Sequence, residues 1–409
     1  MHVVIFEGIH WKTFAPLSLS RPVFMLATGM SALLDKQLRH TNPTRVTLWV
    51  RPELADFCRR RIIPKLRIPA QVNVPLDDEP ALLVSGRTLH FHTYTMRPEE
   101  SAVIDPGGVV RIARVRMPGL SPADAMGRTP RWLEIQKLPR MPEQTRMVTR
   151  LWDLIKWNEE SLVEDSARMR CNAVPRPAGH YHIIEDENIC LREDVDIQPG
   201  AVLDGSKGPV MVDHHAQVGA NAVLQGPCYI GPYVQVSPHG LIRPGTTIGP
   251  MCKVGGEISN SIIFGYTNKI HEGFLGDSYV GKWVNLGAGT TTSNLKNTYG
   301  EISVRTKDGM EKTGRRFLGA LIGDHTKTAI GTRLMAGSYV GFSTMLATSA
   351  FAPNFVPSFT FLTDRGSEPY RVEKAIEVMK TVFSRRNRTW DETDDQIVNY
   401  AAATAPMVE

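Results

Sequence analysis

The fold is decided by the stretch from Val212 to Val254, which reads VDHHAQVGANAVLQGPCYIGPYVQVSPHGLIRPGTTIGPMCKV. Within this stretch an aliphatic residue recurs at every sixth position. This period matches neither the about 3.6 residues per turn of a helix nor the two-residue alternation of a flat strand. It indicates a solenoid in which each hexapeptide supplies one face and points one aliphatic group inward, so we predict a left-handed parallel β-helix with three hexapeptides per coil. Eight aliphatic slots follow each other here without a slip, at Val212, Val218, Leu224, Ile230, Val236, Ile242, Ile248 and Val254.

The same period covers residues 183–350, with two interruptions. An insertion around Gly205–Gly208 breaks the count once, and residues 293–317, rich in Lys, Arg and Asn, break it again. The second interruption predicts a long loop that leaves the solenoid. Twenty slots give nearly seven coils, and those outside the central run are Ile183, Ile189, Val195, Ala201, Phe274, Val280, Leu286, Ile322, Thr328, Leu334, Val340 and Leu346.

The rest of the chain divides into three segments. Residues 1–150 alternate short apolar runs, the first at Val3–Phe6, with helical stretches, which is typical of an α/β domain with a parallel sheet. Residues 151–179 carry apolar groups at helical spacing and predict one linker helix. Residues 351–409 form a C-terminal extension. Its apolar stripe at residues 368–386 predicts an amphipathic helix packed on the solenoid, and the last twenty residues look frayed.

Composition narrows the functional classes. The net charge is +5 among 409 residues, but no long Lys/Arg block occurs, so nucleic-acid binding has little support. No apolar stretch of about 18 residues predicts a membrane span, and we expect a cytoplasmic protein. An odd number of cysteines without a Cys-x-x-Cys pair indicates neither a disulfide framework nor a zinc knuckle. These cysteines are Cys58, Cys171, Cys190, Cys228 and Cys252.

Two motifs suggest chemistry. Asn268–Asp277 reads NKIHEGFLGD, and Trp283–Asn294 reads WVNLGAGTTTSN. Their order resembles the acetyltransferase half of the bifunctional N-acetylglucosamine-1-phosphate uridyltransferase/glucosamine-1-phosphate N-acetyltransferase. Further marks resemble a divergent branch of that family, with a sugar-nucleotidyltransferase-like domain ahead of the solenoid. These marks are Arg21-Pro22, Trp152–Ile155 with Asn158, Ser293–Asn297 and Asn354–Phe359.

The resemblance implies acetyl transfer from acetyl-CoA to an amino sugar, such as a hexosamine-1-phosphate. Such a reaction needs a base that takes the proton of the amine, and the resemblance assigns this role to His271. It assigns sugar contact to Asn285 and phosphate binding to Arg243, whose guanidinium fork suits two oxygens. Phe274 replaces a tyrosine of the family and Asn260 a phosphate-binding lysine, a loss for which Lys269 could compensate.

The family also implies a coenzyme A site and a homotrimer. The coenzyme would contact Ala288, Asn294 and Thr332, with Lys296 or Lys327 near its phosphates. The long loop at residues 293–317 is expected to reach a neighbouring subunit.

The N-terminal domain departs more strongly from its counterpart. A sugar nucleotidyltransferase has a Gly-x-Gly-Thr-Arg loop after its first strand, where this chain has Gly8–Lys12. The Mg²⁺-binding Asp expected after the third strand is missing, so any metal ligand stays unassigned, with Asp105 as one option. Arg21 and Lys36 remain candidates for nucleotide binding. Coupling to synthesis of UDP-N-acetylglucosamine, with Mg²⁺, is therefore an open expectation.

Three other functions compete. A γ-type carbonic anhydrase needs paired histidines at His-x4-His spacing, which the solenoid lacks. A non-catalytic scaffold would not need His271 or the Gly-Ala-Gly stretch. Acyl transfer to a sugar hydroxyl instead of an amine stays open, together with an inactive N-terminal domain.

Overall fold

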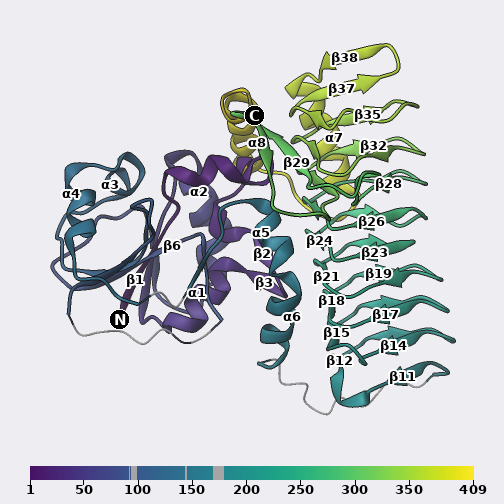
Figure 1. The fold of residues 1–409 in the computed structure, drawn as a ribbon, viewed down its shortest axis with the longest axis horizontal. Helices are drawn as coiled ribbons and strands as arrows, with labels where there is room; N and C mark the ends of the chain where they lie inside the picture. Colours follow the sequence, from purple (N-terminus) through teal and green to yellow (C-terminus); the bar gives the residue numbers. More distant parts are fainter. Residues whose placement is uncertain (92, 94–98, 143–144, 169–178) are drawn as a thin grey trace.

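The computed structural model describes every residue except 92, 94–98, 143–144 and 169–178. It has an N-terminal α/β domain, a β-solenoid of about ten turns and helices at the C-terminal end (Figure 1). The solenoid class predicted from the hexapeptide period is confirmed.

The α/β domain is built on a six-stranded sheet in which a parallel group is extended by two antiparallel strands. The order is β5-β4-β1-β6-β9-β8. The strands are β1 (His2–Phe6), β4 (Arg45–Trp49), β5 (Ala70–Val72), β6 (Ala81–Ser85), β8 (Ser101–Ile104) and β9 (Val110–Val115). Around them lie β2 (Ala27–Thr28), β3 (Ser31–Ala32), β7 (Thr88–Leu89), β10 (Arg146–Met147), α1 (Leu33–Thr41), α2 (Ala55–Phe57), α3 (Pro122–Gly127) and α4 (Pro130–Glu134).

Each coil of the solenoid contributes to three parallel faces. Face 1 holds β11 (His182–Ile184), β14 (Val202–Asp204), β17 (Val223–Gln225), β20 (Leu241–Ile242), β23 (Glu257–Ser259) and β26 (Phe274–Gly276), with β28 (Thr291–Thr292) and β33 (Arg333–Leu334) beyond. Face 2 holds β12 (Ile189–Leu191), β15 (Val210–Val212), β18 (Cys228–Ile230), β21 (Thr246–Ile248), β24 (Ile262–Ile263), β27 (Tyr279–Val280), β31 (Ala320–Ile322), β34 (Ser338–Val340) and β36 (Phe355–Val356).

Face 3 completes the coils. It holds β13 (Asp196–Ile197), β16 (Gln217–Val218), β19 (Gln235–Val236), β22 (Lys253–Val254) and β25 (Asn268–Lys269). It continues through a bridge at Asn285 to β32 (Lys327–Thr328), β35 (Met345–Ala347) and β37 (Thr360–Thr363). The last strand, β38 (Gly366–Pro369), pairs antiparallel with β37.

The aliphatic slots form one core along the solenoid axis, and two details correct the six-residue count. Leu275, not Phe274, points inward, and Phe274 faces a surface cavity. The reason is that some coils are short: the equivalent corner residues Met251 and Tyr266 are 15 positions apart instead of 18. The predicted number of nearly seven coils was too low, because the count missed inward residues in short coils, such as Ile258 and Ile263, and beyond residue 350, such as Ala352 and Val356. The last coil reaches Thr363.

The linker is two helices, α5 (Leu151–Lys156) and α6 (Asn158–Ser166), where one was predicted. Asn158 lies at the break and is buried. Its Nδ2 donates to the Gly245 carbonyl at 2.7 Å, and its Oδ1 accepts from the Gly29 amide at 2.6 Å. It therefore ties the α/β domain to the solenoid. The end of the predicted linker segment, which contains Pro175 and Pro177, lies outside the described residues.

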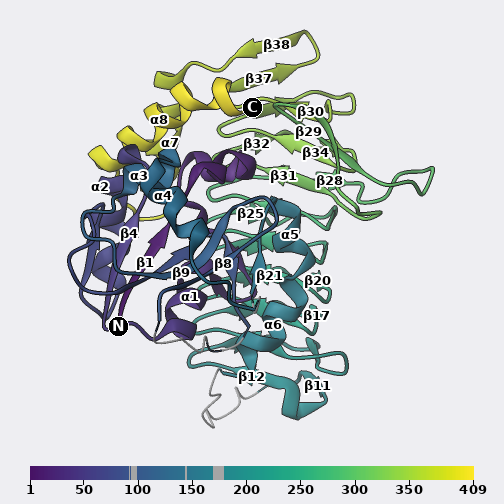
Figure 2. The ribbon, with the colours of Figure 1, turned by 60° about the vertical axis from the view of Figure 1, so that its left-hand side comes forward.

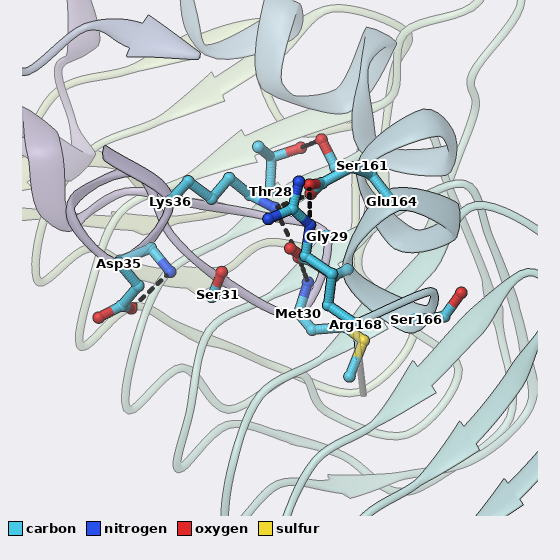
Figure 3. A network of polar contacts seen from close by, with 12 residues as sticks. Thr28, Gly29, Met30, Ser31, Asp35, Lys36, Ser161, Glu164, Ser166 and Arg168 are labelled. Atoms are coloured by element: carbon cyan, nitrogen blue, oxygen red, sulfur yellow. Dashed lines mark hydrogen bonds and ion pairs between the residues drawn. The ribbon is translucent and has the colours of Figure 1, made fainter. Parts of the chain in front are cut away.

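A second tie joins α1 to α6 (Figure 3). Lys36 is fully buried, and its Nζ donates to Asp165 at 2.5 Å, while Arg39 donates to the other oxygen of Asp165 at 2.7 Å. Burial lowers the pKa of Lys36 and Asp165 opposes that shift. The ammonium predicted as a nucleotide ligand is thus engaged between two helices.

The C-terminal extension ends in two helices, α7 (Val372–Ser384) and α8 (Glu392–Val408). The expectation of a frayed end is wrong, because α8 packs on the α/β domain and on α7 (Figure 2). Val398, Ala401 and Ala405 belong to the same buried cluster as Trp11 and Leu151. Tertiary packing therefore holds a helix whose own apolar pattern is weak.

Two other sequence expectations can be compared with the described residues. None of their helices is long and apolar enough to cross a membrane. Cys58, Cys228 and Cys252 are free and buried, whereas Cys190 is disulfide-bonded. An odd cysteine count does not exclude a single bridge, so the expectation of no disulfide is corrected.

Candidate functional site

His271 lies on the turn between faces 3 and 1, directly after β25. Its side chain is exposed and lines a cavity of about 570 Å³. His239 and Ser237 line the cavity from the preceding coil, and Phe274 lines it from β26. A base in this position is accessible to a substrate on the outside of the solenoid.

Lys269 fixes the turn that carries His271. It occupies an inward position in register with Val254 and is 2% exposed. Its Nζ donates to the carbonyl oxygens of Gly255 at 2.9 Å and His271 at 3.1 Å, and burial lowers its pKa to about 8. The ammonium predicted to bind substrate therefore points into the coil and positions the backbone of His271.

Small residues continue this corner into the next coils. The amide of Gly289 donates to the Glu272 carbonyl at 3.1 Å, and that of Gly331 donates to the Ala288 carbonyl at 2.7 Å. Ala288 thus stacks beyond the His271 turn. Thr332 does not open on this surface, because its hydroxyl is buried and donates to the Ala329 carbonyl at 2.8 Å.

The charges around His271 are acidic. Glu257 and Glu272 line its cavity, and among the described lining residues no Lys or Arg occurs. Arg243 lies nearby but donates to Glu257 at 2.7 Å. Asn260 donates to Asp277 at 2.6 Å and does not line the cavity. Within one chain the site suits an amine better than a phosphate.

Asn285 opens on a different cavity. Its Oδ1 accepts from Asn268 Nδ2 at 3.3 Å on face 3, and it lines a cavity of about 730 Å³ that does not include His271. One chain alone therefore does not bring the predicted base and the predicted sugar ligand into one cavity. Sequence reasoning named Lys327 and Asn285, but it missed the aromatic residues and the other basic residues that line this second cavity.

The long loop folds back on its own chain. Asn294 donates to Asp277 at 2.7 Å, and Lys296 donates to the Glu301 carbonyl at 2.5 Å. The loop contains a hairpin of β29 (Ser303–Thr306) and β30 (Gly309–Lys312). Glu311 of this hairpin accepts from Arg150 Nε at 2.9 Å. The side chains proposed for the coenzyme are thus bonded within the loop and to the solenoid.

Open α/β sheets bind ligands at the carboxyl ends of their parallel strands. In this protein, side chains of the chain itself fill that space. Glu7, just after β1, is buried and accepts from Arg51 Nε at 3.0 Å and from the Val23 amide at 3.1 Å. The Arg51 guanidinium lies 3.7 Å from the Trp11 ring centroid and donates to the Tyr400 hydroxyl of α8 at 3.1 Å. Burial raises the pKa of Glu7, and Arg51 opposes that shift.

The other nucleotide candidates are also engaged. Arg21 is buried and forms an ion pair with Asp324 of the solenoid, below the Phe264 ring. Asp105 accepts from the amides of Gly107 and Val109 in its own turn. No group of three or more His, Cys, Asp or Glu residues suited to a metal occurs in the described part of the chain.

Comparisons with known proteins agree with both halves of the molecule. A sugar nucleotidyl transferase family model matches residues 3–172. A bifunctional sugar-1-phosphate nucleotidylyltransferase/acetyltransferase of Sulfurisphaera tokodaii is 34% identical over 137 residues, which are 33% of this chain and 34% of that protein. The uncharacterized acetyltransferase YaiX of Escherichia coli O6:K15:H31 is 30% identical over 171 residues, which are 41% of this chain and 74% of that protein.

The chain spans only about a third of the first of these relatives. Among solved structures, a Francisella novicida UDP-N-acetylglucosamine acyltransferase matches 53% of this chain and 90% of its own. Its identity is 15% and its TM-score is 0.24, so this likeness carries no argument.

Proposed function

Because the chain belongs to the divergent GlmU-like family, we propose that it transfers an acyl group, acetyl in the simplest case, from a coenzyme A thioester to the amino group of a sugar phosphate. One observation carries this proposal. His271 is exposed in a cavity on a turn that a buried lysine holds in place. The names of the relatives support transferase activity, and the acceptor is our inference.

The chemistry requires little beyond a base and positioned substrates. The neutral amine attacks the thioester carbonyl, so that a C–N bond forms and the C–S bond breaks. An imidazole nitrogen of His271 takes the proton of the amine and returns it to the departing thiolate. A placed general base contributes a factor of about 10²–10⁴ to such a step.

The acceptor class follows from the charges. Glu257 and Glu272 attract an amino group, while the cavity has no cation of its own for a phosphate. We propose that a homotrimer supplies the missing groups, because Asn285 lies in a separate cavity of the same chain. Arg243, once released from Glu257, is the phosphate ligand within the chain.

The test is thiol release from acetyl-CoA with glucosamine-1-phosphate, glucosamine or glucose-1-phosphate as acceptor. His271→Ala should lower kcat about 100-fold or more with little change in KM. The exposed His182 of β11 provides a matched control, and His182→Ala should keep the wild-type rate.

Two results would overturn the proposal. Transfer to glucose-1-phosphate without transfer to glucosamine-1-phosphate would establish a sugar O-acyltransferase. Absence of thiol release with all three acceptors would leave a non-catalytic scaffold.

A further inference from the structure

The 730 Å³ cavity on face 3 lies apart from the His271 cavity of the same chain, and of the residues that line it the proposed acyl transfer uses Asn285 alone. Its floor is a row of outward side chains of face 3, its wall is the corner between faces 2 and 3, and its roof is the end of α7. We propose that this cavity binds a nucleoside diphosphate sugar. The proposal does not depend on acyl transfer, because it is argued from lining residues other than Asn285 and because His271 does not line the cavity.

Aromatic rings stacked along the corner form the wall. Tyr233 stacks on His215 with ring centroids 4.7 Å apart, and Tyr266 stacks on Trp283 at 4.2 Å. Half of the surface of Tyr233 is exposed. Such rings offer flat apolar faces on which a nucleobase or a pyranose ring can lie.

At these aromatic residues the backbone adopts a conformation that bulky side chains disfavour. The φ angles are 58° at Tyr233, 63° at Tyr266 and 60° at Trp283. Glycine or asparagine adopts this left-handed region at lower cost than a residue with a bulky side chain. Trp283 also stacks on Phe383 of α7 with ring centroids 4.3 Å apart, so its ring serves the contact with that helix. The turns at Tyr233 and Tyr266 do not need an aromatic side chain, so we assign those two rings to recognition of a ligand.

The charge of the cavity is positive. Lys253, Lys327, Arg385 and Arg386 line it, and no Asp or Glu occurs among its described lining residues. Arg386 is fixed, since it donates to Asn268 Oδ1 at 2.6 Å, and Lys327 donates to the Trp283 carbonyl at 3.1 Å.

Two of the four cations are free to meet a ligand. Within the described part of the chain, the side chains of Lys253 and Arg385 have no hydrogen-bond or ion-pair partner. The dipole of α7 accounts for basic residues at its C-terminal end. It does not account for Lys253 and Lys327, which come from face 3. Cations on two sides of one cavity suit a diphosphate better than a single phosphate.

Amide side chains complete the floor. Gln217 and Gln235 line the cavity, and in the described structure neither side chain has a hydrogen-bond partner. An amide both donates and accepts, which matches the hydroxyl groups of a sugar. The cavity volume lies within the range of about 300–1,000 Å³ that is usual for small-molecule sites. The aromatic rings, the cations and the amide side chains thus match the nucleobase, the diphosphate and the sugar of a nucleoside diphosphate sugar.

The experiment is calorimetric titration of the full chain with UDP-N-acetylglucosamine, UDP and N-acetylglucosamine. UDP-N-acetylglucosamine should bind most tightly, UDP more weakly, and the uncharged sugar least. Tyr233→Asn keeps a residue that tolerates positive φ, and it should weaken binding about tenfold through the lost stacking. Lys253→Gln should weaken it about fivefold. Lys207→Gln, on an exposed solenoid turn, is the matched control.

Three outcomes would overturn the proposal. The first is no binding of UDP-N-acetylglucosamine at millimolar concentration. The second is wild-type affinity in a folded Tyr233→Asn/Lys253→Gln double variant, which would place the nucleotide elsewhere, for example in the α/β domain. The third is tighter binding of coenzyme A with the same sensitivity to both substitutions, which would assign the cavity to the acyl donor.

Discussion

Replacing Lys269 by Met tests whether its ammonium is buried as the structure describes. Met keeps the length of the side chain but neither titrates nor donates. The pKa of Lys269 is about 8 in the folded protein, against 10.5 for the free side chain. Each pKa unit corresponds to about 1.4 kcal/mol, so folding with a charged Lys269 costs up to about 3 kcal/mol at neutral pH.

The sign of the pH dependence follows from this difference. Below pH 8 both states hold the proton, and the cost is complete. Between pH 8 and 10.5 the folded state has released the proton while the unfolded state still binds it, so stability rises with pH. Urea unfolding at pH 7.5 and pH 9.5 should therefore show a larger gain for the wild type than for Lys269→Met. The half-buried Lys282 and Lys327, whose pKa values burial also lowers, contribute equally to both proteins and cancel.

Activity separates two roles for the same side chain. If Lys269 positions His271 by bonding its carbonyl, Lys269→Met should lower kcat about tenfold and leave KM nearly unchanged. The exposed Lys207→Met provides the control. If stability rose equally with pH in the wild type and in Lys269→Met, Lys269 would not be buried. If Lys269→Met raised KM for the sugar phosphate and left kcat intact, Lys269 would bind substrate instead of positioning His271.

Three further predictions concern stability, assembly and nucleotidyl transfer. Asp165→Asn should lower the free energy of unfolding, measured in urea, by about 3–5 kcal/mol, because Lys36 loses its buried partner. The control is Glu160→Gln, at an exposed ion pair. Equal losses of stability in the two variants would contradict this prediction. Light scattering at micromolar concentration should give a trimer, and a monomer would count against a shared site. Incubation of the protein with UTP, Mg²⁺ and N-acetylglucosamine-1-phosphate should release pyrophosphate only at the background rate, because Glu7 and Arg51 fill the strand ends. Mg²⁺-dependent release above that rate would reverse this conclusion.

The hexapeptide period was sufficient to predict the solenoid because each slot is repeated many times, so single exceptions do not hide it. It failed locally where a coil is short. Counting on in sixes from Ile263 gives Lys269 and then Leu275, and both point inward. That count would have placed the Lys269 amine inside the coil, whereas the resemblance alone suggested a substrate contact.

The exposed His271 could be predicted from its motif, but the second cavity could not. Tyr233 lies 33 residues before Tyr266, and Trp283 lies 17 residues after it. All three line one cavity only because the coils stack at one corner. The roof is still more distant, since Arg386 reaches Asn268 across 118 positions. A cavity that is formed by stacked coils and by a helix from the C-terminal extension cannot be recognised in any single repeat.

The N-terminal domain illustrates the opposite limit, where a missing motif was visible but its structural replacement was not. Without the glycine-rich loop, the ends of β1 and β4 are free to carry Glu7 and Arg51, which pair with each other. Arg21 pairs with an aspartate 303 positions away, and Lys36 with one 129 positions away. Charges that would neutralise nucleotide phosphates instead hold this domain to α6 and to the solenoid. The α/β architecture is therefore present while its cationic side chains serve the interface with the solenoid.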